Sequence, residues 1–143
     1  MTKMIENFKI LAQFVKDISC ETPDVQTYIA VKENISKYHL NININSKALK
    51  NKMIEVNTTL KFEDKLLNDK KSYFEVNYAS VVKVNEEIKD KKILEKIILC
   101  DVQKSIYPNL EKILINLIHN CGFPEVKMEK KVDFDKLYNE RSN

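Results

Sequence analysis

The hydrophobic pattern of this chain changes its period once, and that change constrains the fold more than any other feature. Four segments alternate between apolar and polar side chains, at residues 8–20, 38–45, 53–63 and 72–84. Alternation with period two is typical of strands that bury one face. In the first segment most apolar side chains stand at even positions, so we expect the even positions to share one face.

The connections between these segments indicate how the strands are joined. The stretches 46–52 and 64–71 are short and polar, which favours a meander of antiparallel strands. The stretch 21–37 is longer and carries Pro23 near its start, so we expect a crossover loop there.

Beyond residue 90 the apolar spacing becomes helical. Across residues 110–121 apolar side chains recur at i, i+3, i+4, i+7, i+8 and i+11, which predicts a long amphipathic helix. Pro108 fits the first turn of this helix if Ser105 is its N-cap, and Gly122 predicts its end. Asp133 is expected to cap a short last helix.

Strands followed by helices are typical of an α+β domain. We therefore expect a four-stranded antiparallel sheet with the C-terminal helices packed on one face. A chain of 143 residues favours a single domain over 1–143. A domain of this size buries about 70% of the surface of its unfolded chain, which is enough for a hydrophobic core.

The composition argues against several classes of enzyme. Gly122 is the single glycine, so no glycine-rich phosphate loop can be formed. His39 and His119 are the two histidines and stand in no zinc-binding motif. The three cysteines lie far apart without a CxxC pair, which favours reduced thiols. We expect no catalytic residue, no cofactor and no metal.

Charge and hydropathy limit the partners. The net charge is +3 and Arg141 is the single arginine, which disfavours nucleic acid because its recognition favours arginine. No apolar run approaches the roughly 18 residues that span a bilayer. Glu6 and Asn7 stand where a signal peptide would be apolar. We expect a cytoplasmic protein that is not inserted in a membrane.

Several stretches of the sequence resemble one family. They are residues 14–23 (FVKDISCETP), 73–79 (YFEVNYA), 107–108 (YP), 121–124 (CGFP) and 132–138 (VDFDKLY). Together they resemble the SecB family of protein-export chaperones. The resemblance implies a holdase that binds unfolded secretory precursors and delivers them to the SecA translocation motor. Members of that family are usually strongly acidic, whereas this chain is mildly basic.

The resemblance also implies a docking site for SecA, at Asp17, Glu21, Tyr73 and Glu75. Alternation alone indicates only that these side chains share an outward orientation on two strands of one sheet. Carboxylates grouped on a sheet can steer a cationic partner and set its register. Without the resemblance, these residues are equally typical of a solvated strand face.

A second expected site is a groove for unfolded precursors. SecB-like proteins hold such chains in grooves lined by aromatic and aliphatic residues, and exposed apolar surface marks this kind of binding. The candidates are Phe14, Tyr28, Tyr38, Phe74 and Tyr78. Ordinary core packing is the alternative for each of these side chains.

The helical stripe and the unpaired sheet edges, with extra apolar residues at Leu11 and Val15, predict a homotetramer built as a dimer of dimers. Two other functions stay open. One is a SecB-like chaperone dedicated to a toxin–antitoxin pair, and the other is a small-ligand-binding module or enzyme of α+β type.

Overall fold

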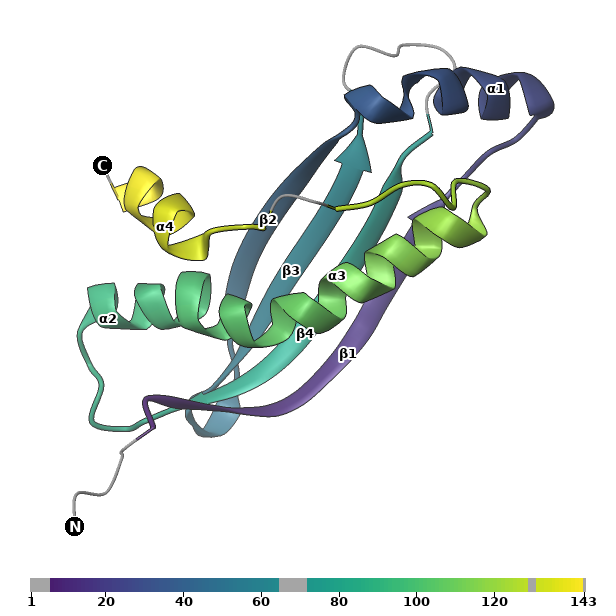
Figure 1. Ribbon diagram of the computed structural model, residues 1–143. Coiled ribbons are helices and arrows are strands. Elements are labelled where there is room, and N and C mark those ends of the chain that lie inside the picture. Colours follow the sequence, from purple (N-terminus) through teal and green to yellow (C-terminus); the bar gives the residue numbers. More distant parts are fainter. Residues whose placement is uncertain (1–5, 65–71, 129–130, 143) are drawn as a thin grey trace.

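The computed structural model describes residues 6–64, 72–128 and 131–142. Four antiparallel strands form one sheet in the order β1-β4-β3-β2 (Figure 1). The strands are β1 (Phe8–Cys20), β2 (His39–Ala48), β3 (Met53–Glu63) and β4 (Phe74–Val84). The α-helices are α1 (Val25–Asn34), α2 (Lys91–Lys96), α3 (Val102–Asn120) and α4 (Phe134–Ser142). The predicted α+β fold is confirmed.

Helices α2 and α3 cross one face of the sheet, which we call the helix face (Figure 1). Even-numbered residues of β3 and β4, such as Leu60 and Val76, lie on this face in the same core as Leu110, Leu114 and Ile118 of α3. Burying each of these aliphatic side chains contributes about 1.5–3 kcal/mol. Odd-numbered residues of β3 and β4 point to the opposite side, which we call the open face. No helix of the described residues crosses the open face (Figure 1).

The end of α3 follows the sequence prediction. Gly122 has a φ of 107°, in a region that side chains rarely adopt. Its N–H donates to the carbonyl of His119 at 3.2 Å, and the N–H of Phe123 donates to the carbonyl of Ile118 at 3.3 Å. This pair of bonds is the Schellman arrangement, in which glycine ends a helix and the next residue turns back onto it. Phe123 is accordingly buried in the core.

The expected crossover loop at 21–37 is wrong, because most of it is helical. Helix α1 is followed directly by a 3-10 turn, η1 (Ile35–Lys37). Asp24 begins the helix by accepting a hydrogen bond from the N–H of Thr27 at 2.7 Å. Only Thr27 and Val31 of the helix are buried, so its apolar residues form no stripe that periodicity could detect.

The prediction that Ser105 caps the second helix is also wrong. A five-residue π-helix, η3 (Ile97–Asp101), joins α2 to α3 without a break, and Pro108 lies inside α3. Gln103 is fully buried beside this π-helix and donates to the carbonyl of Ile98 at 3.1 Å. Its amide oxygen accepts from the hydroxyl of Thr58 at 2.9 Å, which ties the helix layer to β3.

Strand β1 departs from simple alternation. Its pairing with β4 shifts between Ile10 and Ala12 and again between Val15 and Asp17. Each shift inserts one extra residue, as in a β-bulge, and so exchanges the two faces of the strand. The expectation that all even positions share one face is therefore wrong for Ala12 and Phe14, which pair with Val81 and Ala79 of the open face.

Candidate binding surfaces

The predicted docking residues of β1 and β4 come together on the open face. Ser19 pairs with Glu75 and Asp17 pairs with Asn77, so these side chains lie on the same side of the sheet. The Ser19 hydroxyl donates to a carboxylate oxygen of Asp17 at 3.0 Å. Asp17 and Glu21 are exposed, and Glu75 is half-buried. The side chains of Asp17 and Glu75 thus lie near one end of the open face, and Glu21 follows directly after the last residue of β1.

Tyr73, which directly precedes β4, has a positive charge over its ring. The ammonium of Lys61 lies 4.5 Å from the centroid of its ring. Lys61 is also the direct cross-strand partner of Glu75 and lies 3.8 Å from a carboxylate oxygen of Glu63. We call Asp17, Glu21, Tyr73 and Glu75 the candidate docking face. Lys61 of β3 contacts the Tyr73 ring and lies opposite Glu75.

Sequence reasoning did not identify Lys61. The alternation of β3 places it on the polar side, out of phase with Phe62. That pattern could have indicated a shared face with Glu75, but only the register shows that the two residues are opposite each other.

A second ionic group on the open face holds the bulged edge strand. The ammonium of Lys16, the extra residue of the second bulge, lies 3.2 Å from a carboxylate oxygen of Glu55 on β3. Asn57 donates to the same oxygen at 2.8 Å. Both hydrogen bonds hold the pKa of Glu55 below its usual value, and the one from Asn57 has the larger effect. The bridge therefore reaches across β4 and connects β1 to β3.

Three of the expected groove residues lie in the core. Phe74 is fully buried, and Tyr38 and Tyr78 are nearly so. The hydroxyl of Tyr38 donates to the carbonyl of Ser72 at 2.6 Å, and burial raises the pKa of this phenol to about 12. The hydroxyl of Tyr78 donates to the side-chain oxygen of Gln13 at 2.9 Å. These three rings therefore offer almost no surface to a client in this structure.

The other two groove candidates keep some surface. Phe14 is 48% exposed on the open-face side of β1. Tyr28 of α1 is half-buried, stacks on Phe123 with ring centroids 5.1 Å apart, and donates to the carbonyl of Gly122 at 2.9 Å. Tyr38 and Phe74 are neighbours, with ring centroids 6.3 Å apart, and Tyr28 and Phe74 both pack against Phe123, whereas Phe14 lies on the open-face side of β1.

Strand β1 exposes more apolar surface than any other strand. It is an edge strand, and four of its side chains are between 38% and 48% exposed: Leu11, Phe14, Val15 and Ile18. An exposed apolar edge is a template for pairing with another chain unless something covers it. This edge is therefore a candidate surface for protein contacts.

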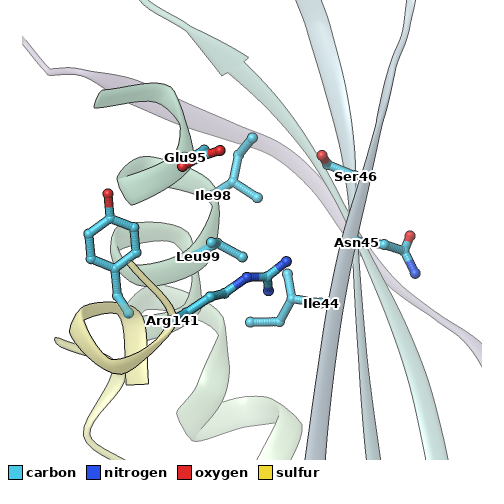
Figure 2. A pocket seen from close by; sticks show the side chains of 8 residues that line it. Ile44, Asn45, Ser46, Glu95, Ile98, Leu99 and Arg141 are labelled. Carbon is cyan, nitrogen blue, oxygen red and sulfur yellow. The ribbon is translucent and has the colours of Figure 1, made fainter. Parts of the chain in front are cut away.

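A hollow of about 410 Å³ lies beside the other edge strand, β2 (Figure 2). Its apolar walls are Ile44 of β2 and Ile98 and Leu99 of the π-helix. Glu95 of α2 and Arg141 of α4 also line it. In Figure 2 the Arg141 side chain extends toward Ile44, whereas Asn45 points away to the open face. Sequence reasoning noted Arg141 only as the single arginine and did not predict this hollow.

Helix α4 is held against the helix layer by a polar contact and an aromatic one. Asp135 accepts from the thiol of Cys100 at 3.0 Å and from the ammonium of Lys104 at 2.7 Å. These hydrogen bonds lower the pKa of the Asp135 carboxyl. The pKa of Cys100 is raised to about 11, mainly by burial and next by the hydrogen bond to Asp135. The thiol therefore stays protonated and can donate. Phe134 packs edge-on against Tyr107, with centroids 5.3 Å apart.

Two further features of the described residues bear on the kind of protein. No group of three or more His, Cys, Asp or Glu side chains in residues 6–64, 72–128 and 131–142 is placed to hold a metal ion. In the same part of the chain, no helix has both the length and the apolar character that crossing a membrane requires.

An open sheet face, an exposed apolar edge and a hollow beside the second edge are surfaces of the kind that α+β domains use to bind other polypeptides. The family described as "Preprotein translocase subunit SecB" matches residues 2–143. The chain therefore belongs to the SecB family of protein-export chaperones. It is 57% identical over 140 residues to a Pelagibacter ubique (strain HTCC1062) protein named "Putative protein-export protein SecB", covering 98% of this chain and 100% of that protein.

More distant relatives agree with this assignment. The protein-export protein SecB of Rhodopseudomonas palustris (strain BisB18) is 28% identical over 131 residues, covering 90% of this chain and 77% of the relative. Among solved structures, the Mycobacterium tuberculosis Rv1957 SecB-like chaperone, in complex with a ChAD peptide from the Rv1956 HigA1 antitoxin, superposes with a TM-score of 0.62. That match has 10% sequence identity and covers 87% of this chain and 91% of the other. At this identity it supports the fold alone.

Proposed function

We propose that this chain is a cytoplasmic export chaperone that binds unfolded secretory precursors and delivers them to the SecA motor. The observation that carries the proposal is the juxtaposition of Asp17, Glu75 and Tyr73 at one end of the open face, at the positions that the family resemblance assigns to motor docking. Exposed charge pairs contribute only about 0–1 kcal/mol each. Affinity should therefore come from several contacts, repeated over the copies of an oligomer.

The docking proposal is tested by titrating the oligomer with the cationic C-terminal segment of the motor. Replacing Asp17 and Glu75 together by alanine should weaken binding sharply and leave precursor binding intact. The matched control replaces Glu86 and Glu87 by alanine, because this pair removes the same charge beyond the other end of β4. If the Asp17/Glu75 variant binds the motor segment as well as the parent does, the docking assignment is wrong.

Holdase activity is the second part of the proposal, and it needs no nucleotide. The assay is suppression of aggregation of a slowly folding precursor, with and without ATP. Phe14 and Tyr28 are our candidates for client contact among the five aromatic residues, because they keep exposed surface. A lack of suppression at molar excess of the chain would count against the holdase proposal, and so would a requirement for ATP.

We also propose that the chain assembles as a homotetramer, a dimer of dimers. The support is the exposed apolar edge strand β1, whose Leu11, Val15 and Ile18 lose contact with water if a second copy covers them. Light scattering at micromolar concentration should give the mass of four chains. The variant Val15→Lys should shift the mass toward smaller species, whereas Lys47→Gln on the opposite edge should not. A stable parent monomer would contradict the proposal.

Service to a toxin–antitoxin pair is the alternative function. The similarity to the Mycobacterium tuberculosis chaperone supports only the shared fold, whereas the relative at 57% identity is designated for protein export. A pulldown from the native cytosol separates the two functions. Signal-bearing precursors and the motor should co-purify with an export chaperone, and one dedicated antitoxin should co-purify with the alternative.

A further inference from the structure

The middle of the open face is covered by side chains of the chain itself. No helix of the described residues crosses this face (Figure 1), yet Ala79 of β4 is fully buried and Asn57 of β3 is only 8% exposed. The register sets Ala79 between Phe14 and Asn57. The ammonium of Lys16 reaches Glu55 across β4, so its aliphatic stem crosses this part of the face. The side chain of Lys16 is therefore part of the cover.

Beneath this cover lie two hydrogen-bond acceptors without donors. Asn57 donates its amide N–H groups to Glu55 at 2.8 Å and to Asn45 at 3.4 Å. Because a carboxylate only accepts, this contact fixes which atom of the Asn57 amide is the oxygen. That oxygen is buried, and within the described part of the chain nothing donates to it; the same holds for the side-chain oxygen of Asn77 on β4. Asn77 pairs with Thr59, two residues from Asn57, so the two amides are diagonal neighbours on the open face.

Lys16 is a weakly held occupant of this place. It is the extra residue of the second bulge, so it has no partner in the register with β4. Its side chain is 40% exposed, and an ion pair of that exposure contributes little to stability. Its ammonium lies 3.2 Å from Glu55 but donates to neither amide oxygen. The place therefore holds a cation while two buried acceptors beside it stay unused, and unused buried acceptors are a cost that a better donor removes.

The chemistry of these acceptors suits a basic side chain. Glu55 supplies a negative charge, and the two amides supply neutral oxygens beside it. A guanidinium carries five N–H donors in a planar fork, so one arginine can serve a carboxylate and a neighbouring amide oxygen together. Along β3, Glu55 is six residues from Lys61, which lies opposite Glu75 of the candidate docking face. The two groups of acceptors are therefore about 20 Å apart, a distance that about six residues of an extended segment span.

We propose that Glu55, Asn57 and Asn77 form a second subsite on the open face, which Lys16 fills in the free chain and a basic side chain of the motor's segment fills on docking. We call these three residues the middle subsite. The inference rests on the proposed docking function and adds a spacing rule to it. The segment lies extended on the open face and carries two basic residues about six positions apart. One meets the candidate docking face, and the other displaces Lys16 and donates to the middle subsite.

The test uses the full chain and two fluorescent peptides of equal length and charge. Both are neutral except for two arginines, spaced as Arg-x-x-x-x-x-Arg or as Arg-x-Arg, and binding is measured by fluorescence anisotropy. Only the widely spaced peptide can reach both groups of acceptors. Glu55→Gln should weaken its binding about two- to fivefold, the range of a largely exposed charge pair, and should leave the closely spaced peptide unchanged. The new side-chain oxygen can still accept from Asn57, so the variant removes the charge and keeps that hydrogen bond.

A second variant, Lys16→Gln, tests the competition. It should tighten binding of the widely spaced peptide about two- to fivefold relative to the closely spaced one, because Glu55 is then free. Lys32→Gln is the matched control, because it removes one positive charge from an exposed position of α1, outside the sheet. Any change that it causes should be the same for both peptides. The proposal is overturned if Glu55→Gln affects both peptides equally or neither, and also if Lys16→Gln behaves like Lys32→Gln.

Two further measurements separate the possible failures. Light scattering should give Lys16→Gln and Glu55→Gln the mass of the parent. A changed mass without a difference between the peptides would assign the middle subsite to a contact between copies of the chain and overturn the proposal. Motor binding that depends on Asp17 and Glu75 but not on Glu55 would refute the middle subsite alone. If neither the motor's segment nor either peptide binds the parent, the docking function itself is refuted together with the middle subsite.

Discussion

The position of Lys61 beside the candidate docking face leads to a quantitative prediction. Its ammonium lies 4.5 Å from the Tyr73 ring centroid and 3.8 Å from a Glu63 oxygen, and its side chain is 35% exposed. An exposed cation–π contact contributes about 0.5–1 kcal/mol, and an exposed ion pair about 0–1 kcal/mol. A cationic side chain of the motor that approaches Tyr73 and Glu75 must displace this ammonium or bind beside it.

Two like charges about 4 Å apart repel by about 1 kcal/mol in water. Replacing Lys61 by glutamine should therefore improve binding of the motor's cationic segment by about 0.5–1 kcal/mol, or about two- to fivefold in Kd. Isothermal titration with the parent and the variant measures this change directly. The improvement should be largest at low salt, where surface charges are screened least.

The control for this prediction is Lys83→Gln. Lys83 also lies on the open face of β4, but eight residues from Glu75, or about 27 Å along the strand. That distance exceeds the screening length of about 8 Å at physiological ionic strength. Equal improvement in the two variants would mean that net charge matters and position does not. Unchanged or weaker binding by Lys61→Gln would refute the reasoning that Lys61 competes with the partner.

Three further predictions concern stability. Gly122→Ala should lower the free energy of unfolding by at least about 1–2 kcal/mol in urea denaturation, because a Cβ would meet Tyr28 at 2.7 Å and the φ of 107° strains an alanine. Gln103→Leu should cost about 1–3 kcal/mol by leaving the buried Thr58 hydroxyl without its partner, and adding Thr58→Val should recover part of that loss. The lowered pKa of Asp135 means that its contribution is present above its ordinary value of 3.8 and is lost as the pH falls through the folded-state pKa. Asp135→Asn should therefore lower the thermal midpoint at neutral pH and flatten its decline in acid.

The sheet and the C-terminal helix could be predicted because each has a long periodic segment. Residues 53–63 bury alternate side chains under α3, and the predicted range is the observed strand β3. Helix α1 escaped prediction for the converse reason. Its Val25 and Ile29 are exposed while Thr27 is buried, so polarity does not follow the helical period. Tertiary contacts, and not an apolar stripe, determine the position of this helix.

The candidate sites were predicted less completely than the fold. Alternation shows that Phe74 and Tyr78 share a buried face, but it does not show whether a chain's own helices or a client cover that face. The structure places both residues in the core. Lys61 and Arg141 were missed for a different reason. Lys61 matters because it lies opposite Glu75 of β4, and Arg141 matters because it lines a hollow beside β2. Neither contact between distant segments can be recognised from the pattern of one segment.

The two irregularities of β1 explain why alternation placed Asp17 on the correct face although it placed Phe14 on the wrong one. One extra residue exchanges the faces of a strand, and a second extra residue restores them. Both shifts precede Asp17, so its face is the one that uninterrupted alternation predicts, but its partner differs by two positions. If the strands paired without shifts from Phe8–Val84 onward, Asp17 would lie opposite Glu75. In the observed register Asp17 lies opposite Asn77, and Ser19 lies opposite Glu75. Like charges directly opposite each other destabilise a strand pair. The two bulges therefore keep the carboxylates of Asp17 and Glu75 on one side of the sheet while moving them out of direct opposition.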